Sequence, residues 1–173
     1  MPKIIENVRE QLLEEAKRQV AENGYGKTTI RSVARACGIG VGTVYNYFDS
    51  KDMLIASFMA QDWKQFLQCI DSDASEDAKE VLKNIVAGLS DFMQKYRVLF
   101  SDPDAVKVYT DVFAVRHQLI REQLAYKIKP LCMKAPVEDK DFLAEWIAES
   151  LSTWTAVGKD FEEQYKIINQ LIK

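Results

Sequence analysis

Apolar residues recur every three or four positions along almost the whole chain, and this spacing limits the fold more than any other feature of the sequence. Near the N-terminus it places apolar residues on one face of a helix and charged residues on the other; the apolar set is Ile5, Val8, Leu12, Leu13, Ala16 and Val20. No segment shows the alternation of apolar and polar residues that predicts a strand. The chain is therefore predicted to be all-α.

Caps and breakers divide the 173 residues into about eight to nine helices. Asn23 and Gly24 end the first helix, and Gly38, the acidic segment 71–77 and Gly158 mark later boundaries. The helices expected after the first cover about 29–36, 41–48, 51–70, 75–97, 101–131, 139–157 and 159–172. We expect residues 1–50 to form a three-helix domain with a helix-turn-helix unit, and residues 51–173 to form a helical bundle.

The N-terminal third contains two very short helices, 29–36 and 41–48, which a glycine-containing turn joins and longer helices flank. A helix-turn-helix unit has this organisation, and its second helix enters the major groove of DNA, which is about 12 Å wide. Hydroxyl, amide and cationic side chains, the types that contact phosphates and bases, occur throughout residues 28–51. The pattern therefore indicates a DNA-binding unit.

Three segments, Asn23–Ala34, Ala36–Phe48 and Ser50–Leu54, resemble the N-terminal domain of the TetR family of bacterial transcriptional regulators in their order and spacing. The resemblance covers roughly residues 5–60, and beyond it the chain is similar to the family only in being helical and of suitable size. It implies a homodimeric, sequence-specific DNA-binding regulator. Most members are repressors, which leave their operator when a small-molecule effector binds the C-terminal domain.

The resemblance also implies which residues face DNA. Thr29 would contact a phosphate, Arg31 a base or a phosphate, and Gly42 would let the backbone approach the DNA closely. Thr43 and Asn46 would face base edges. The whole expected set, which includes two tyrosines and a lysine for phosphates, is Thr28, Thr29, Arg31, Val41, Gly42, Thr43, Tyr45, Asn46, Tyr47 and Lys51.

Some of these residues have simpler explanations. The sequence departs from the common family pattern at Gly40 and Val41, where serine and lysine are usual; Val41 would instead touch a thymine methyl. A helical interaction module that has kept the motif without binding DNA is therefore the alternative function. Phe48 is expected to be a core aromatic, and Cys37 an inert buried thiol. A nucleotide-binding glycine loop at 38–42 would need a preceding strand, which the helical spacing of 30–37 excludes.

The helix expected at 139–157 has apolar residues around more of its circumference than one core face needs. We expect one side to pack inward and another to pack on a second subunit; the proposed interface residues are Phe142, Trp146, Ile147, Ser150 and Trp154. A two-fold dimer would bind a palindromic operator, because its two recognition helices are related by the same symmetry. The alternative is the central helix of a monomeric bundle.

Bulky side chains are frequent in the C-terminal part, and a bundle of this kind can enclose an effector cavity. The residues proposed to line it are Trp63, Phe66, Phe92, Met93, Tyr109, Phe113 and His117. The same residues are also what an ordinary packed core contains, and His117, the only histidine, also fits a surface position.

The charges are divided unequally along the chain, whose formal net charge is −3. Residues 17–48 contain five cations and one anion, whereas residues 61–173 contain 15 cations and 19 anions. The five cations are Lys17, Arg18, Lys27, Arg31 and Arg35. The negative net charge therefore excludes a protein that is basic over its whole surface, but it does not exclude a local basic surface.

Other function classes have little support in the sequence. The three cysteines lie far apart, so neither a disulfide framework nor a zinc cluster is indicated. With one histidine and no assembled set of catalytic motifs, we expect no enzyme, no metal and no cofactor other than an unidentified effector. No apolar segment has the length of a signal peptide core or a membrane span, and we expect a cytoplasmic protein.

Overall fold

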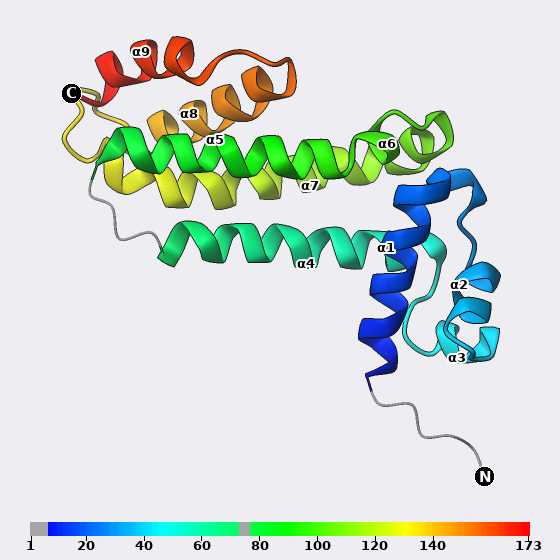
Figure 1. Ribbon diagram of the computed structural model, residues 1–173. Coiled ribbons are helices and arrows are strands. Elements are labelled where there is room, and N and C mark those ends of the chain that lie inside the picture. Colours follow the sequence, from blue (N-terminus) through cyan, green and yellow to red (C-terminus); the bar gives the residue numbers. More distant parts are fainter. Residues whose placement is uncertain (1–6, 73–76) are drawn as a thin grey trace. The chain divides into compact units, whose positions relative to one another are not determined.

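The computed structural model describes residues 7–72 and 77–173, without the side chains of residues 72 and 108–117. The regular secondary structure of these residues is entirely helical, which confirms the all-α prediction (Figure 1). The first helix, α1 (Val8–Lys27), is broken at Gly24, where φ is 79° and only glycine adopts the conformation without strain. Because of this break, the described residues hold ten helical segments, slightly more than the eight or nine expected.

The chain forms two compact units, and the first comprises the residues up to Trp63 together with Lys95–Thr110. It contains α1, α2 (Ile30–Ala36), α3 (Val41–Tyr45), α6 (Arg97–Phe100), and the beginnings of α4 (Lys51–Ser72) and α7 (Pro103–Cys132). The α2 helix packs on both α1 and α3, and α6 packs on α1. Buried residues from five of these helices form the core, including Leu12, Val33, Val44, Phe58 and Leu99.

The second unit comprises Lys64–Gln94 and Asp111–Lys173. It contains the remainder of α4 and α7 together with α5 (Ala78–Lys95), α8 (Lys140–Ala156) and α9 (Phe161–Ile172), and α8 packs on α9. Its core includes Leu82, Ile85, Leu124, Ile128, Ile147 and Leu151. The phenyl ring of Phe66 lies directly against the α5 backbone at Gly88, so that a Cβ at this position would overlap the ring. The domain boundary at residue 50 stays a prediction.

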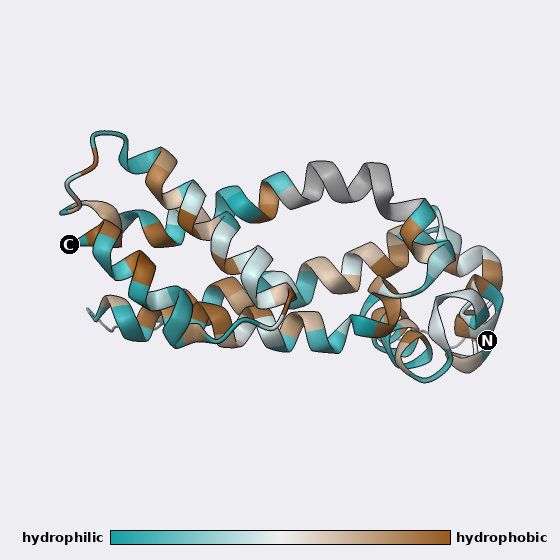
Figure 2. Cartoon of the chain, turned by 90° about the horizontal axis from the view of Figure 1, so that it is seen from above, coloured by the Kyte–Doolittle hydropathy of each residue, from teal (hydrophilic) through white to brown (hydrophobic). Residues whose placement is uncertain are grey.

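Local signals explain where several helices begin. The Asp139 carboxylate accepts a hydrogen bond from the backbone amide of Phe142, at 2.9 Å, and begins α8. Asp160 begins α9 by accepting from the amides of Glu162 and Glu163. Hydrophobic and hydrophilic residues alternate at short intervals along the helices (Figure 2), in keeping with the recurrent apolar spacing. Among the described residues, no helix combines the length and the apolar character that would carry it across a membrane.

Candidate nucleic-acid interface

The beginning of α2 is fixed by a reciprocal pair of hydrogen bonds. The hydroxyl of Thr29 accepts from the backbone amide of Ser32 at 3.0 Å, and the hydroxyl of Ser32 accepts from the backbone amide of Thr29 at 3.0 Å. This capping box satisfies two amides that the first turn of a helix would otherwise leave unpaired. Thr29 itself is exposed, and its hydroxyl hydrogen is not used by the cap, so Thr29 can still donate to a phosphate.

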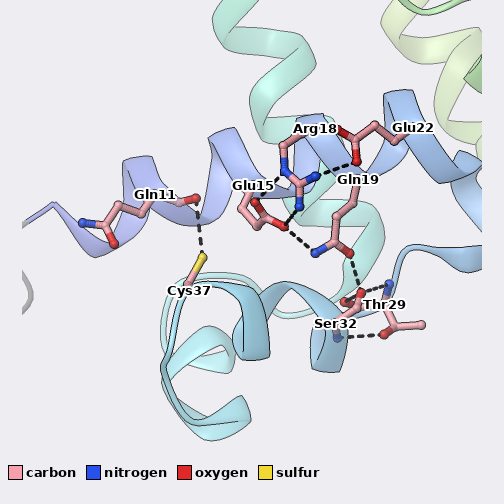
Figure 3. A network of polar contacts seen from close by, with 8 residues as sticks. All are labelled: Gln11, Glu15, Arg18, Gln19, Glu22, Thr29, Ser32 and Cys37. Atoms are coloured by element: carbon pink, nitrogen blue, oxygen red, sulfur yellow. Dashed lines mark hydrogen bonds and ion pairs between the residues drawn. The ribbon is translucent and has the colours of Figure 1, made fainter.

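A polar network attaches α2 to α1 (Figure 3). The Ser32 hydroxyl donates to the side-chain oxygen of Gln19 at 2.5 Å, and the Gln19 amide donates to Glu15 at 2.7 Å. Arg18 donates two hydrogen bonds to Glu15 and one to Glu22, and its guanidinium holds the pKa of Glu15 below the usual value. The network fixes the orientation of the helix-turn-helix unit on α1.

The short helix α3 and the turn after it place one side chain in the core and expose several to solvent. Val44 is fully buried, whereas Tyr45 and Tyr47 are 52% and 45% exposed and Asn46 is also exposed. Gly42 is exposed on the same side of the helix as Tyr45 and Asn46, which lie three and four residues further on. A Cβ placed on Gly42 would meet no atom of the described protein within 4 Å. The fold therefore does not require glycine at this position, and the backbone here is open to a partner.

Two further residues of α3 belong to the expected DNA-facing set. Val41 and Thr43 are half-buried, so each presents part of its side chain to solvent. Phe48 is only 4% exposed, which confirms that it is a core aromatic. The α3 helix ends at Tyr45 rather than at Phe48, because the backbone closes into a turn in which the amides of Tyr47 and Phe48 both donate to the Val44 carbonyl.

Two expected DNA contacts have other partners in the structure. Thr28 is 1% exposed and its hydroxyl donates to the carbonyl of Gly24 at 2.9 Å, which corrects its assignment to the DNA-facing set. The Lys51 ammonium donates to the carbonyl of Tyr25 at 3.0 Å and lies 3.4 Å from the centroid of the Tyr25 ring. Burial lowers the pKa of Lys51, and the hydroxyl of Tyr25 donates to Asp52 at 2.6 Å. Lys51 therefore braces the start of α4 against the end of α1, and its phosphate contact stays a prediction.

The cations of the first unit fall into two groups. Lys17 is paired with Asp62 at 2.7 Å, and Arg18 is paired with Glu15 and Glu22, so neither adds free positive charge. Lys27, Arg31 and Arg35 are exposed, and none has a carboxylate partner among the described residues. Arg31 and Arg35 lie four residues apart and so share one face of α2.

Sequence reasoning missed one further cation. Arg9, near the start of α1, is exposed, and its guanidinium carbon lies 5.5 Å from the centroid of the Phe48 ring, just beyond α3. No described carboxylate pairs with it. Its position depends on a contact between residues far apart in the chain, and the helical pattern of α1 shows only that Arg9 faces away from the core.

The proposed interface residues of α8 are divided between its surface and its interior. Phe142, Trp146 and Trp154 are 63%, 42% and 47% exposed and lie at intervals of four and eight residues, with the half-buried Ser150 between them. Ile147 is fully buried in the second unit, which corrects its assignment to the subunit interface. Val157, next to the end of α8, is 66% exposed and extends the apolar face. We refer to Phe142, Trp146, Trp154 and Val157 as the α8 face.

Four of the seven proposed effector residues have described side chains. Trp63 is buried in the first unit, whereas Phe66, Phe92 and Met93 are half-buried in the second. The side chains of Tyr109, Phe113 and His117 lie outside the described residues. Within the described residues, no group of three or more histidine, cysteine, aspartate or glutamate side chains is arranged to hold a metal ion. The cavity proposal therefore stays a prediction.

Comparison with known proteins adds independent support for the fold and the motif. Residues 12–58 match the model of a family described as bacterial regulatory proteins, tetR family. The chain is 30% identical over 79 residues to the fatty acid metabolism regulator protein of Bacillus subtilis, of which it covers 41%, with 44% of the chain itself matched. It is 22% identical to the HTH-type transcriptional repressor AcnR of Corynebacterium efficiens, with 94% of the chain and 89% of that protein covered.

Solved structures show the same fold over nearly the whole chain. A transcriptional regulator from Streptomyces coelicolor superposes with a TM-score of 0.69 at 15% identity, and covers 94% of this chain and 96% of its own. A transcriptional regulator from Cytophaga hutchinsonii superposes with a TM-score of 0.63 at 22% identity, with 94% and 93% covered. The family match falls on the capped α2, the turn and the α3 helix described above. The segment at residues 12–58 is therefore similar to the tetR family of bacterial regulatory proteins, and the remainder of the chain shares the fold of the solved regulators.

Proposed function

We propose that this protein is a sequence-specific, double-stranded-DNA-binding transcriptional regulator that acts as a homodimer. The observation that carries the proposal is the outer side of α3, where Gly42, Tyr45 and Asn46 are exposed while Val44 anchors the helix in the core. A short helix of this kind fits the major groove, where an amide can read base edges. Tyrosine hydroxyls on either side of Asn46 supply phosphate contacts.

The unpaired cations suit the same partner. Arg31 and Arg35 on α2, and Lys27 before it, lack carboxylate partners among the described residues, and we add Arg9 to this group. Guanidinium groups bind phosphates through two parallel hydrogen bonds, and the release of counterions from DNA strengthens such contacts at low salt. We infer that Arg9, held over the Phe48 ring, contacts the DNA backbone beside the recognition helix.

We propose that the α8 face forms the subunit interface. Phe142, Trp146 and Trp154 expose large apolar areas on one helix, a feature typical of contact surfaces between proteins. A two-fold dimer would place its recognition helices on half-sites one helical turn of DNA apart, about 34 to 36 Å, or a multiple of this distance. The operator should therefore be palindromic.

We further propose that the protein is a repressor and that a small-molecule effector binding in the second unit releases it from DNA. The name of the C. efficiens relative, a transcriptional repressor, supports the direction of regulation. Release requires that the effector bind the conformation without DNA affinity more tightly than the DNA-binding conformation. Equal affinity for both would leave the equilibrium between them unchanged. A regulator of this kind acts in the cytoplasm without catalysis, a metal or another cofactor.

Selection of bound sequences from a random DNA pool tests the function directly. We expect a palindromic consensus, and an affinity for it that falls steeply as salt concentration rises. Tyr45→Ala should lose most of the affinity while the protein remains dimeric. Recovery of no consensus, together with identical weak binding by the wild type and Tyr45→Ala, would overturn the proposal in favour of an interaction module without DNA binding.

A further inference from the structure

A cavity of about 100 Å³ lies within the first unit, on the side of α1 that faces α6. Its wall is mainly apolar and is formed by Val20, Ala21, Phe58, Val98 and Leu99. Lys17, Lys95 and Tyr96 complete the lining. None of these lining residues belongs to the proposed DNA-facing set or to the proposed effector set.

The polar lining residues converge on a single carboxylate. Asp62 accepts hydrogen bonds from Lys17 at 2.7 Å and from the hydroxyl of Tyr96 at 2.5 Å, and it is also paired with Lys95. Two ammonium groups therefore share one carboxylate, which leaves one positive charge without a second carboxylate partner among the described residues, at the edge of an apolar cavity. Lys95 is the more exposed of the two, with 46% of its side chain accessible against 34% for Lys17.

These features define the chemistry of a ligand. An apolar wall favours an alkyl chain, and the uncompensated ammonium favours an anionic head group at the rim. A dry cavity of about 150 Å³ holds benzene, so a cavity of about 100 Å³ holds a shorter chain of about four carbon atoms. We propose that this cavity binds short-chain monocarboxylates, with the alkyl chain between α1 and α6 and the carboxylate beside Lys95.

An occupant of this site would touch both α1 and α6. The α1 helix carries Arg9 and is joined to α2 through the network of Ser32 and Gln19, so ligand binding would act on the element that supports the recognition helix. Ligand binding to this cavity does not depend on the proposed DNA-binding function, because it can be measured in the absence of DNA.

The experiment is a titration of the full-length, methyl-labelled protein with acetate, butyrate, pentanoate and octanoate, followed by NMR at the methyl groups of Val20, Val98 and Leu99. We expect shifts at these methyls and an affinity that rises about fourfold for each added methylene. The rise should stop between pentanoate and octanoate, when the chain exceeds the cavity. The neutral probe pentanol should bind more weakly than pentanoate.

Two variants and a matched control locate the site. Lys95→Met should weaken pentanoate binding about fivefold and leave pentanol binding unchanged. Ala21→Phe, at an exposed lining position, should block both ligands; Lys83→Met, at an exposed position on the same helix as Lys95, should change neither. Absence of shifts at the three methyls, or shifts that survive Ala21→Phe, would overturn the site. Equal binding of pentanol and pentanoate would overturn the anionic ligand class.

Discussion

Aromatic side chains are exposed at two places in this molecule, and their neighbours differ. At the end of α3, Tyr45 and Tyr47 carry hydroxyl groups in a unit where Arg9, Arg31 and Arg35 are exposed and have no carboxylate partner among the described residues. On the α8 face, Phe142 offers no hydrogen-bonding group, and the exposed acidic Glu145 lies on the same helix. The first combination suits a polyanion and the second an apolar protein surface. Exposed aromatic side chains thus indicate a contact site in both places, and the polar or charged groups near them indicate the kind of partner.

The largest effect is expected from disrupting the α8 face. The double substitution Trp146→Glu and Trp154→Glu removes two large apolar anchors from each subunit and sets four like charges in the interface. We expect the dimer dissociation constant to rise by about 100-fold or more, measured by sedimentation equilibrium. The control Glu145→Gln, on an exposed position of the same helix, should leave the dimer unchanged. A double variant that still dimerises with unchanged affinity would show that subunits associate elsewhere.

The next effect concerns the unpaired cations. Arg31→Ala should weaken operator binding about tenfold and lower the slope of log affinity against log salt concentration by about one, because one phosphate is no longer neutralised. Fluorescence anisotropy at several salt concentrations measures both quantities. Lys166→Ala removes the same charge from an exposed position on α9 and should have no comparable effect. If both variants lose affinity equally, the overall charge rather than the α2 face determines binding.

Arg9 extends the same test to a proposed phosphate contact that the sequence alone did not indicate. Arg9→Ala should weaken operator binding about fivefold, because it removes one solvent-exposed phosphate contact. The fold should persist, because Phe48 stays buried. Arg9→Lys should recover part of the affinity, since a lysine at the same place keeps the charge but loses the planar stacking on the ring. An Arg9→Ala protein with wild-type affinity and salt dependence would confine the interface to α2 and α3.

The helix-turn-helix unit was predictable because its signals are local. The expected helix at 29–36 differs by one residue from the observed α2, since Thr29 caps it and Gly38, with a φ of 68°, ends the following turn. The α6 helix was not predicted, because four residues, Arg97–Phe100, are too few to show a period. Phe48 was correctly assigned to the core, because its spacing from Val44 places both on one face.

The roles of individual polar residues depended on contacts that no local pattern contains. Thr28 belongs to the same threonine pair as Thr29, yet the break at Gly24 turns its hydroxyl inward to a carbonyl. Lys51 is directed to the carbonyl of Tyr25, which lies on a different helix. In α8, the apolar spacing identified the helix but did not separate the buried Ile147 from its exposed neighbour Trp146, because both are apolar.

A smaller change tests the hydroxyl groups themselves. Tyr45→Phe and Tyr47→Phe keep the rings and remove one hydrogen bond each, so operator affinity should fall about threefold to fivefold for each substitution. Tyr126→Phe, at a position on α7 that is 75% exposed, is the matched control and should have no effect. Full affinity in the Tyr45 and Tyr47 variants would mean that the aromatic rings contact DNA by packing, and would weaken the contrast with the α8 face.

The smallest effect is expected on stability, from the Asp62 carboxylate that pairs with Lys17 and Lys95. Burial raises the pKa of Asp62, but hydrogen bonds from Lys17, Lys95 and Tyr96 outweigh burial, and its pKa lies below the usual value. A carboxylate with a lowered pKa in the folded state stabilises the fold above its unfolded-state pKa, and this contribution is lost as the pH falls through the folded-state value. The wild type should therefore lose stability to urea below about pH 4, and the difference between wild type and Asp62→Asn should shrink there. If the difference in the free energy of unfolding between wild type and Asp62→Asn stays constant from neutral to acidic pH, Asp62 acts through packing and not through its charge.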